Sequence, residues 1–153
     1  MARNSMMLAI DPGQSGGIAW SDFDGTVHAE PMPEGMTEQI DAIRSLVATC
    51  PGIRAIVEKV GTYMPGNSGP AAATFARHCG HIEAALYCLG VPTVQVMPKK
   101  WQKELGALPK DKEQRKRVIK ELMARRYPHL RVTLLVADAL GILTYAGIVK
   151  EIK

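Results

Sequence analysis

The sequence predicts an α/β fold in which a mixed β-sheet is flanked by helices. Two observations lead to this prediction. Three short apolar runs separated by turn-forming residues open the chain, and strand-like runs then alternate with helical runs to its end. We find no internal repeat, low-complexity tract or linker, and 153 residues is the usual length of one domain. Residues 1–153 are therefore expected to form a single domain.

The first three strands are expected to form two consecutive hairpins. They are expected over residues 6–10, 16–20 and 26–32. Residues 14–17 supply the first turn, and "SDFDG" over residues 21–25 is a strong signal for the second. Pro31 and Pro33 end the third strand. Because proline is tolerated chiefly at the edge of a sheet, we expect this strand at an edge.

Helices and strands alternate from residue 37 onward. Apolar residues at helical spacing predict a helix over residues 37–50, with Thr37 as its N-cap and Pro51-Gly52 as its stop. Residues 53–60 and 92–98 are typical of short strands. Further helices are expected over residues 71–89, 99–106 and 111–126, and from about residue 136 to the C-terminus.

The overall composition is that of an ordinary soluble globular protein. The hydrophobic fraction is 46% and the charged fraction is 22%, so the chain can bury a core without disulfides or metals. No apolar run approaches the ~20 residues of a membrane helix, and the N-terminal apolar segment runs into Asp11 rather than a signal-peptide cleavage site. Cys50, Cys79 and Cys88 lack CxxC spacing, which predicts reduced core thiols in a cytoplasmic protein.

Three acidic residues lie in otherwise apolar segments. Asp11 ends the first expected strand, Glu58 ends the fourth, and Asp138 is expected in the first turn of the last helix. Each has a structural explanation. Asp11 can shape its turn, and Asp138 can complement the helix dipole. Glu58 can pair with Arg54 or Lys59, although Lys59 points to the opposite face of the strand. Together they favour a metal site, because hard oxygen ligands from separate elements suit Mg²⁺.

Four segments occur in a characteristic order along the chain. They are "AIDPGQSGGIAW", "AIVEKV", "VMPKKWQKELG" and "VADALGIL". In this order and spacing they resemble a RuvC-type Holliday junction resolvase of the RNase H-like superfamily. The compact, phage-like branch with a P-x-x-W-x-K segment is the most similar. The resemblance extends from about residue 7 to residue 146.

The resemblance implies a fold, an activity and a cofactor. The family fold is a five-stranded mixed sheet whose first three strands are antiparallel, with helices on both faces. By resemblance, Asp11, Glu58 and Asp138 are the catalytic residues and bind Mg²⁺, with Mn²⁺ as a substitute. Two ions roughly 4 Å apart would activate water and stabilise the leaving 3′ oxygen. A homodimer would nick four-way or branched DNA symmetrically in recombination and repair, in a bacterial cell or a bacteriophage-infected host.

One position departs from the family pattern. The family usually places an acid or a histidine about three residues before the last-helix aspartate, where this chain has Leu135, preceded by Leu134. Several interpretations stay open. In one, Asp11, Glu58 and Asp138 suffice to bind both ions together with water and substrate phosphate. In another, Asp111 or Glu113 reaches the metal site. Otherwise the second ion binds weakly and cutting is slow or absent, or this chain is an altered form of an active one.

Positive charge is concentrated between residues 110 and 131. This segment has nine basic residues against three acidic ones, a net +6, whereas the whole chain carries +4 and has a pI of about 9.1. One interpretation is a solvated helix face, and the other is contact with nucleic-acid phosphates. The candidate DNA-binding residues are Lys100, Lys103, Lys112, Arg115 and Lys116.

Aromatic residues and histidines supply further candidates. Tyr63 follows Glu58 in a loop where larger relatives place an aromatic that wedges into the junction. It stacks on an exposed base or is an ordinary surface aromatic. Trp101 either lies in the core or anchors the following helix, and the core position is favoured. His78 and His81 are three residues apart, and without a third ligand a packed pair is favoured over a metal site.

Four functions remain open from the sequence. The first is a junction-cutting endonuclease, and the second is a resolvase-like module that binds junctions and cuts poorly, which Leu135 favours. The third is another RNase H-like nuclease that acts on RNA or on RNA–DNA hybrids. The fourth is an actin-like ATPase, whose D-x-G turn binds phosphate, but such proteins clamp the nucleotide between two lobes and 153 residues supply one.

Overall fold

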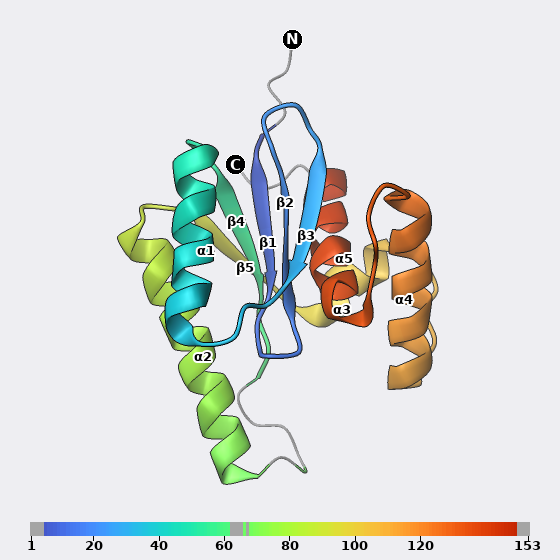
Figure 1. Ribbon diagram of the computed structural model, residues 1–153. Coiled ribbons are helices and arrows are strands. Elements are labelled where there is room, and N and C mark those ends of the chain that lie inside the picture. Colours follow the sequence, from blue (N-terminus) through green and yellow to red (C-terminus); the bar gives the residue numbers. More distant parts are fainter. Residues whose placement is uncertain (1–4, 62–65, 67, 150–153) are drawn as a thin grey trace.

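The computed structural model describes residues 5–61, 66 and 68–149 and shows a five-stranded sheet with helices on both faces (Figure 1). The strands are β1 (Met7–Asp11), β2 (Gly17–Ser21), β3 (Val27–Pro31), β4 (Arg54–Glu58) and β5 (Thr93–Val96). The helices are α1 (Met36–Thr49), α2 (Gly69–Cys88), α3 (Pro98–Glu104), α4 (Lys112–Arg126) and α5 (Leu134–Val149). The predicted fold class is confirmed.

The strand order is β3-β2-β1-β4-β5, so β1 lies at the centre of the sheet. β1 pairs with β2, and β2 with β3, in antiparallel orientation, whereas β4 is parallel to both β1 and β5. The antiparallel arrangement of the first three strands and the edge position of β3 are as predicted. Ile10 lies beside Val57 in the β1–β4 pair, so the carboxyl ends of both strands reach the same edge of the sheet.

Alternation along the strands divides the core into two layers. On β1, Met7 and Ala9 pack with α3, α4 and α5, whereas Leu8 and Ile10 pack with α1 and α2 (Figure 1). Leu8 and Ile10 are fully buried, and burying a side chain of this size contributes about 1.5–3 kcal/mol. Because β1 is covered on both faces, a carboxylate at its end is unusual.

Helix α5 packs across β1 and β2 and is covered on its other side by α4. Ten of its residues, from Val136 to Ala146, are buried, which explains why the helix is apolar almost all round. Among the described residues, no helix is both long enough and apolar enough to cross a membrane.

Each helix starts within two residues of its predicted start, and two of these differences bear on predicted residues. α1 begins at Met36, after Gly35 at φ 76°, so the prediction of Thr37 as the N-cap is wrong and Thr37 lies within the first turn. α5 begins at Leu134 rather than at residue 136. The carbonyl oxygen of Thr133 accepts hydrogen bonds from the N–H groups of Val136 and Ala137, at 3.3 and 3.1 Å, so Thr133 was a start signal that the prediction missed. Asp138 therefore lies in the second turn, where the helix dipole gives it less support than predicted.

The three cysteines are free, as predicted, but they are not all core thiols. Cys50 is buried and Cys79 is partly exposed, whereas Cys88 is exposed. The prediction of a core position is wrong for Cys88, which is the last residue of α2 and is exposed there.

Candidate active site

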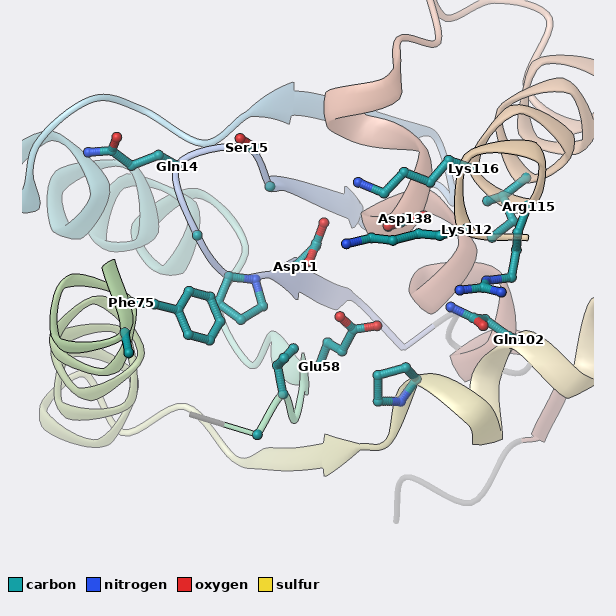
Figure 2. Close-up of a pocket in the computed structure, with 18 residues that line it drawn as sticks. Asp11, Gln14, Ser15, Glu58, Phe75, Gln102, Lys112, Arg115, Lys116 and Asp138 are labelled. Atoms are coloured by element: carbon teal, nitrogen blue, oxygen red, sulfur yellow. The ribbon is translucent and has the colours of Figure 1, made fainter. Parts of the chain in front are cut away.

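A cavity of about 390 Å³ opens at the carboxyl edge of the sheet and is lined by the three predicted acids (Figure 2). Asp11 ends β1, Glu58 ends β4, and Asp138 comes from the second turn of α5. Because β1 and β4 are parallel neighbours, their last side chains meet at one edge. The packing of α5 across β1 adds the third carboxylate.

The turn after β1 depends on two glycines. A Cβ atom at Gly16 would lie 2.0 Å from the carbonyl oxygen of Asp11, and one at Gly17 would lie 2.5 Å from the carbonyl oxygen of Leu135. Any larger residue at either position would have to move the backbone. The turn therefore folds back directly beside Asp11, and β2 begins in contact with the first turn of α5.

Glu58 is the most enclosed of the three acids by exposed surface. It is 9% exposed, and its Oε2 accepts a hydrogen bond at 2.6 Å from the indole N–H of Trp101, which is wholly buried. Burial raises the pKa of Glu58 to about 7, against the lowering effect of the Trp101 hydrogen bond, and the negative charge of Asp138 raises it further. An ionised Glu58 therefore favours a positive partner.

Asp11 and Asp138 are also poorly solvated. Burial raises the pKa of Asp11 well above its usual range, and the negative charges of Glu58 and Asp138 raise it further. Burial likewise raises the pKa of Asp138, while the positive charges of Lys116 and Arg115 lower it. The charges of Glu58 and Asp138 thus disfavour ionisation of Asp11, and that of Asp138 disfavours ionisation of Glu58. Such a cluster attracts protons or a multivalent cation.

Three of the five predicted DNA-binding cations border the same cavity. Lys112, Arg115 and Lys116 come from α4, and the amines of Lys112 and Lys116 extend toward Asp11 and Asp138 (Figure 2). The Nη1 of Arg115 donates to the carbonyl oxygens of Pro109 and Lys110, at 3.3 and 2.8 Å. These bonds hold the guanidinium against the segment before α4.

The other predicted nucleic-acid contacts lie elsewhere. Lys100 and Lys103 are exposed on α3 and do not line the cavity. Gln102, which lies between them in the sequence, lines it. Lys100 borders a separate hollow beside Tyr145. Tyr63 lies outside the described residues.

Comparison with known proteins gives a match at the level of structure. No protein-family model and no curated protein matches the sequence. The structure of T. thermophilus RuvC in complex with a Holliday junction substrate matches with a TM-score of 0.59 at 18% identity, over 95% of this chain and 96% of that chain. A second Thermus thermophilus RuvC structure gives 0.56 at 17% identity, over 95% and 96%. The Fowlpox virus resolvase in complex with Holliday junction DNA gives 0.51 at 10% identity, over 94% and 99%.

The chain has the RuvC fold. This confirms the resemblance drawn from the four sequence segments at the level of the fold. Because the matches extend over nearly the whole of both chains, the RuvC fold includes the strand ends and the helix that carry Asp11, Glu58 and Asp138.

At Leu135, where the resemblance leads us to expect an acid or a histidine, no described acid replaces the expected ligand. Leu135 is 41% exposed and does not line the cavity. Asp111 caps α4, because its Oδ1 accepts a hydrogen bond from the N–H of Gln114 at 2.9 Å, and Glu113 is exposed. Within the described residues, the acids that line the cavity on this RuvC fold are Asp11, Glu58 and Asp138.

Several lining residues were not predicted from the sequence. Among them, Gln14 and Ser15 come from the turn after β1, Gln102 from α3 and Phe75 from α2 (Figure 2). The position of Gln14 and Ser15 in the turn that follows Asp11 was a usable signal. Phe75 had none, because its place at the cavity wall depends on how α2 packs on the sheet.

The acids fit Mg²⁺ by their chemistry. Within the described part of the chain, no three His, Cys, Asp or Glu side chains are close enough to hold a metal ion by themselves. Asp11, Glu58 and Asp138 nevertheless supply hard oxygen ligands whose charges are poorly compensated. Mg²⁺ usually keeps several waters and takes further oxygens from phosphate, so a complete protein cage is not required.

The histidines of α2 form a packed pair, as favoured from the sequence. The rings of His78 and His81 lie 4.9 Å apart between centroids. The amide nitrogen of Gln39 donates to the carbonyl of Pro33 at 2.8 Å, so its oxygen accepts from the Nε2 of His81 at 2.5 Å. This network ties α2 to the segment that precedes α1.

Proposed function

We propose that this chain is a metal-dependent endonuclease that resolves Holliday junctions and other branched DNA. The supporting observation is a single cavity in which three poorly solvated acids from β1, β4 and α5 face the basic side of α4. The acids favour a divalent cation, and the lysines favour an anionic backbone, so a phosphodiester held by both is the substrate that suits the cavity best.

In the proposed mechanism, Asp11, Glu58 and Asp138 hold Mg²⁺, with Mn²⁺ as a substitute. When bound, such ions activate a water molecule and stabilise the leaving 3′ oxygen of the cut strand. Lys112 and Lys116 bind the phosphate at the cavity mouth, and Lys116 also offsets the negative charge of all three acids. The amide of Gln102 donates to a phosphate oxygen and orients it.

Symmetric cutting of a four-way junction requires two active sites. Since a junction of this kind presents two equivalent strands related by a two-fold axis, we propose that a homodimer places one cavity at each strand. The proposed working place is the cytoplasm of a bacterial or phage-infected cell, where branched DNA is the substrate.

A junction-binding protein with weak cleavage is the second candidate. Leu135 favours it, because an apolar side chain stands where the resemblance implies an acid or a histidine, and neither Asp111 nor Glu113 lines the cavity. The basic side of α4 would serve binding equally well without cutting.

A labelled four-way junction separates the two candidates. The protein is incubated with Mg²⁺, with Mn²⁺ and with EDTA. Binding is scored by gel shift and nicking by denaturing gel. Paired, metal-dependent nicks that Asp11→Asn abolishes and Asp22→Asn leaves intact support the endonuclease. Binding without nicks in either metal supports the second candidate, and neither binding nor nicking contradicts both.

A further inference from the structure

The indole of Trp101 links the cavity to the core beneath it. Trp101 is wholly buried, and its N–H donates to Oε2 of Glu58 at 2.6 Å. An indole has one hydrogen-bond donor and no acceptor, so the whole polar capacity of this buried side chain is used on a carboxylate of the cavity. The bond joins residues 43 positions apart and fixes one oxygen of Glu58, leaving Oε1 for other partners.

Gly141 makes room for the same indole on the opposite side. A Cβ atom at Gly141 would lie 2.6 Å from Cζ3 of Trp101 and 3.3 Å from both Cε3 and Cη2. Glycine inside a helix costs about 1 kcal/mol relative to alanine, so its presence in the middle of α5 requires a reason. The close approach of the indole supplies that reason.

The positions of these residues connect two of the three acids. Gly141 follows Asp138 by three residues, so the two lie on neighbouring parts of one face of α5. Trp101 touches α5 with the six-membered ring of its indole and Glu58 on β4 with its nitrogen. The indole therefore spans the distance between the elements that carry Glu58 and Asp138.

We infer that Trp101 and Gly141 are positioning residues that fix the orientation of Glu58 and its separation from Asp138, and thereby set the affinity of the cavity for a divalent cation. The inference rests on the proposed function. Trp101 does not line the cavity, so it acts through its hydrogen bond to Glu58 and its contact with Gly141. Partners that orient metal-binding carboxylates in this way typically change metal affinity by about 10–100-fold.

The first experiment measures Mg²⁺ binding to the DNA-free protein by titration calorimetry. Trp101→Phe keeps an aromatic ring in the core but removes the N–H, and we expect it to weaken Mg²⁺ binding by about tenfold or more. The matched control is Ile142→Val, a substitution at a fully buried α5 residue of the same core layer. If Ile142→Val weakened Mg²⁺ binding as much as Trp101→Phe, a general loosening of the core would explain both and the inference would be wrong.

The second experiment tests whether Gly141 acts through the indole. Gly141→Ala keeps the N–H but forces the indole to move, and we expect a several-fold loss of Mg²⁺ affinity. In the Trp101→Phe background, which lacks the indole atoms Cζ3 and Cη2, the same change should have little further effect. Full additivity of the two substitutions would contradict the inference. Should Trp101→Phe fail to fold, Gly141→Ala alone carries the test.

Fluorescence gives a readout that does not require activity. The chain has two tryptophans, so Trp20→Phe leaves Trp101 as the only tryptophan, which can be excited selectively over the tyrosines. We expect Mg²⁺ to shift the emission of Trp101, and Asp11→Asn to abolish the shift. A protein that binds Mg²⁺ with no change in Trp101 emission, and with equal affinity after Trp101→Phe, would overturn this inference alone. The absence of any Mg²⁺ response in the wild-type chain would overturn the proposed function as well.

Discussion

Two groups of carboxylates lie at opposite ends of the sheet, and their surroundings are opposite in kind. At the β2–β3 turn, Oδ1 of Asp22 accepts from the N–H groups of Asp24 and Thr26, at 3.2 and 3.0 Å, and Oδ2 lies 2.9 Å from Nε2 of His28. The His28 hydrogen bond, followed by that of Asp24, lowers the pKa of Asp22 to about 2. This partly exposed acid is satisfied by its own chain.

The acids of the cavity are poorly satisfied. Trp101 donates to Glu58, but within the described residues the carboxylates of Asp11 and Asp138 accept no hydrogen bond. Burial raises the pKa values of all three. A structural carboxylate therefore differs from a candidate metal ligand in its solvation and its hydrogen-bond donors, and not in its place in a turn or strand.

The largest expected effect comes from the same substitution, aspartate to asparagine, made at each end of the sheet. Asp11→Asn should reduce metal-dependent nicking by at least about 100-fold, because metal-assisted charge stabilisation contributes several kcal/mol to the transition state. It should also raise the melting temperature of the metal-free protein, since it removes a charge that burial and its neighbours disfavour. Asp22→Asn should leave nicking unchanged and lower the melting temperature, because it weakens the bonds within the turn.

Nicking assays and thermal melts of the two variants in parallel check this contrast. If Asp11→Asn destabilised the metal-free chain as Asp22→Asn does, Asp11 would be a turn-forming acid and the proposed contrast would fail.

The two ends should also respond to pH in opposite directions. Burial raises the pKa of Glu58 from 4.5 to about 7, so between these values the folded chain binds more protons than the unfolded chain. The free energy of unfolding should therefore fall as pH rises from about 4.5 to 7, by roughly 3 kcal/mol from Glu58. Asp11 and Asp138 act in the same direction above pH 3.8. Asp22 acts oppositely: its contribution is complete above 3.8 and is lost as pH falls toward 2.

Urea unfolding of the metal-free protein across this pH range measures the effect. Glu58→Gln should flatten the decline between pH 4.5 and 7, and saturating Mg²⁺ should reduce it in the wild-type chain. A stability that rises with pH over this interval would mean that Glu58 is well solvated or paired.

The difference between the two ends also shows how far sequence reasoning reaches. The strands and their pairing were predictable, because Gly- and Asp-rich turns separate short apolar runs and fix the hairpin order. Asp11, Glu58 and Asp138 were identifiable as acids in apolar segments, and the parallel pairing of β1 and β4 brings the first two together. The hairpin strands and the three acids are all marked by patterns within short stretches of the sequence.

The remaining features depend on packing between distant residues. The bond from Trp101 to Glu58 and the contact of Trp101 with Gly141 join separate elements, and nothing in the local sequence reports either one. The start of α5 was missed although Thr133, a residue type favoured at N-caps, directly precedes it, because the exposed apolar residues Leu134 and Leu135 fill the first turn.

A smaller effect is expected from the lysines that flank the acids. Lys116→Gln should weaken junction binding and reduce the slope of log affinity against log salt by about 1, because Lys116 borders the cavity and is expected to contact one phosphate. Lys59→Gln is the matched control. Lys59 directly follows Glu58 but borders a different hollow, beside Cys79 and Ile82, so it should leave the slope unchanged. Gel shifts at several salt concentrations give both slopes, and equal slopes for the two variants would remove α4 from the binding face.

The smallest effect is expected at the position that departs from the family pattern. Leu135→Asp introduces an acid one turn before Asp138, but Leu135 is 41% exposed and lies outside the cavity lining, so the new carboxylate should be solvated like that of Asp22. Exposed charges contribute at most about 1 kcal/mol to a neighbouring interaction, so nicking should change by no more than about fivefold. Leu134→Asp, at 50% exposure, is the control for charge alone. A tenfold or greater rise confined to Leu135→Asp would show that sequence position, not solvation, decides which acids act here.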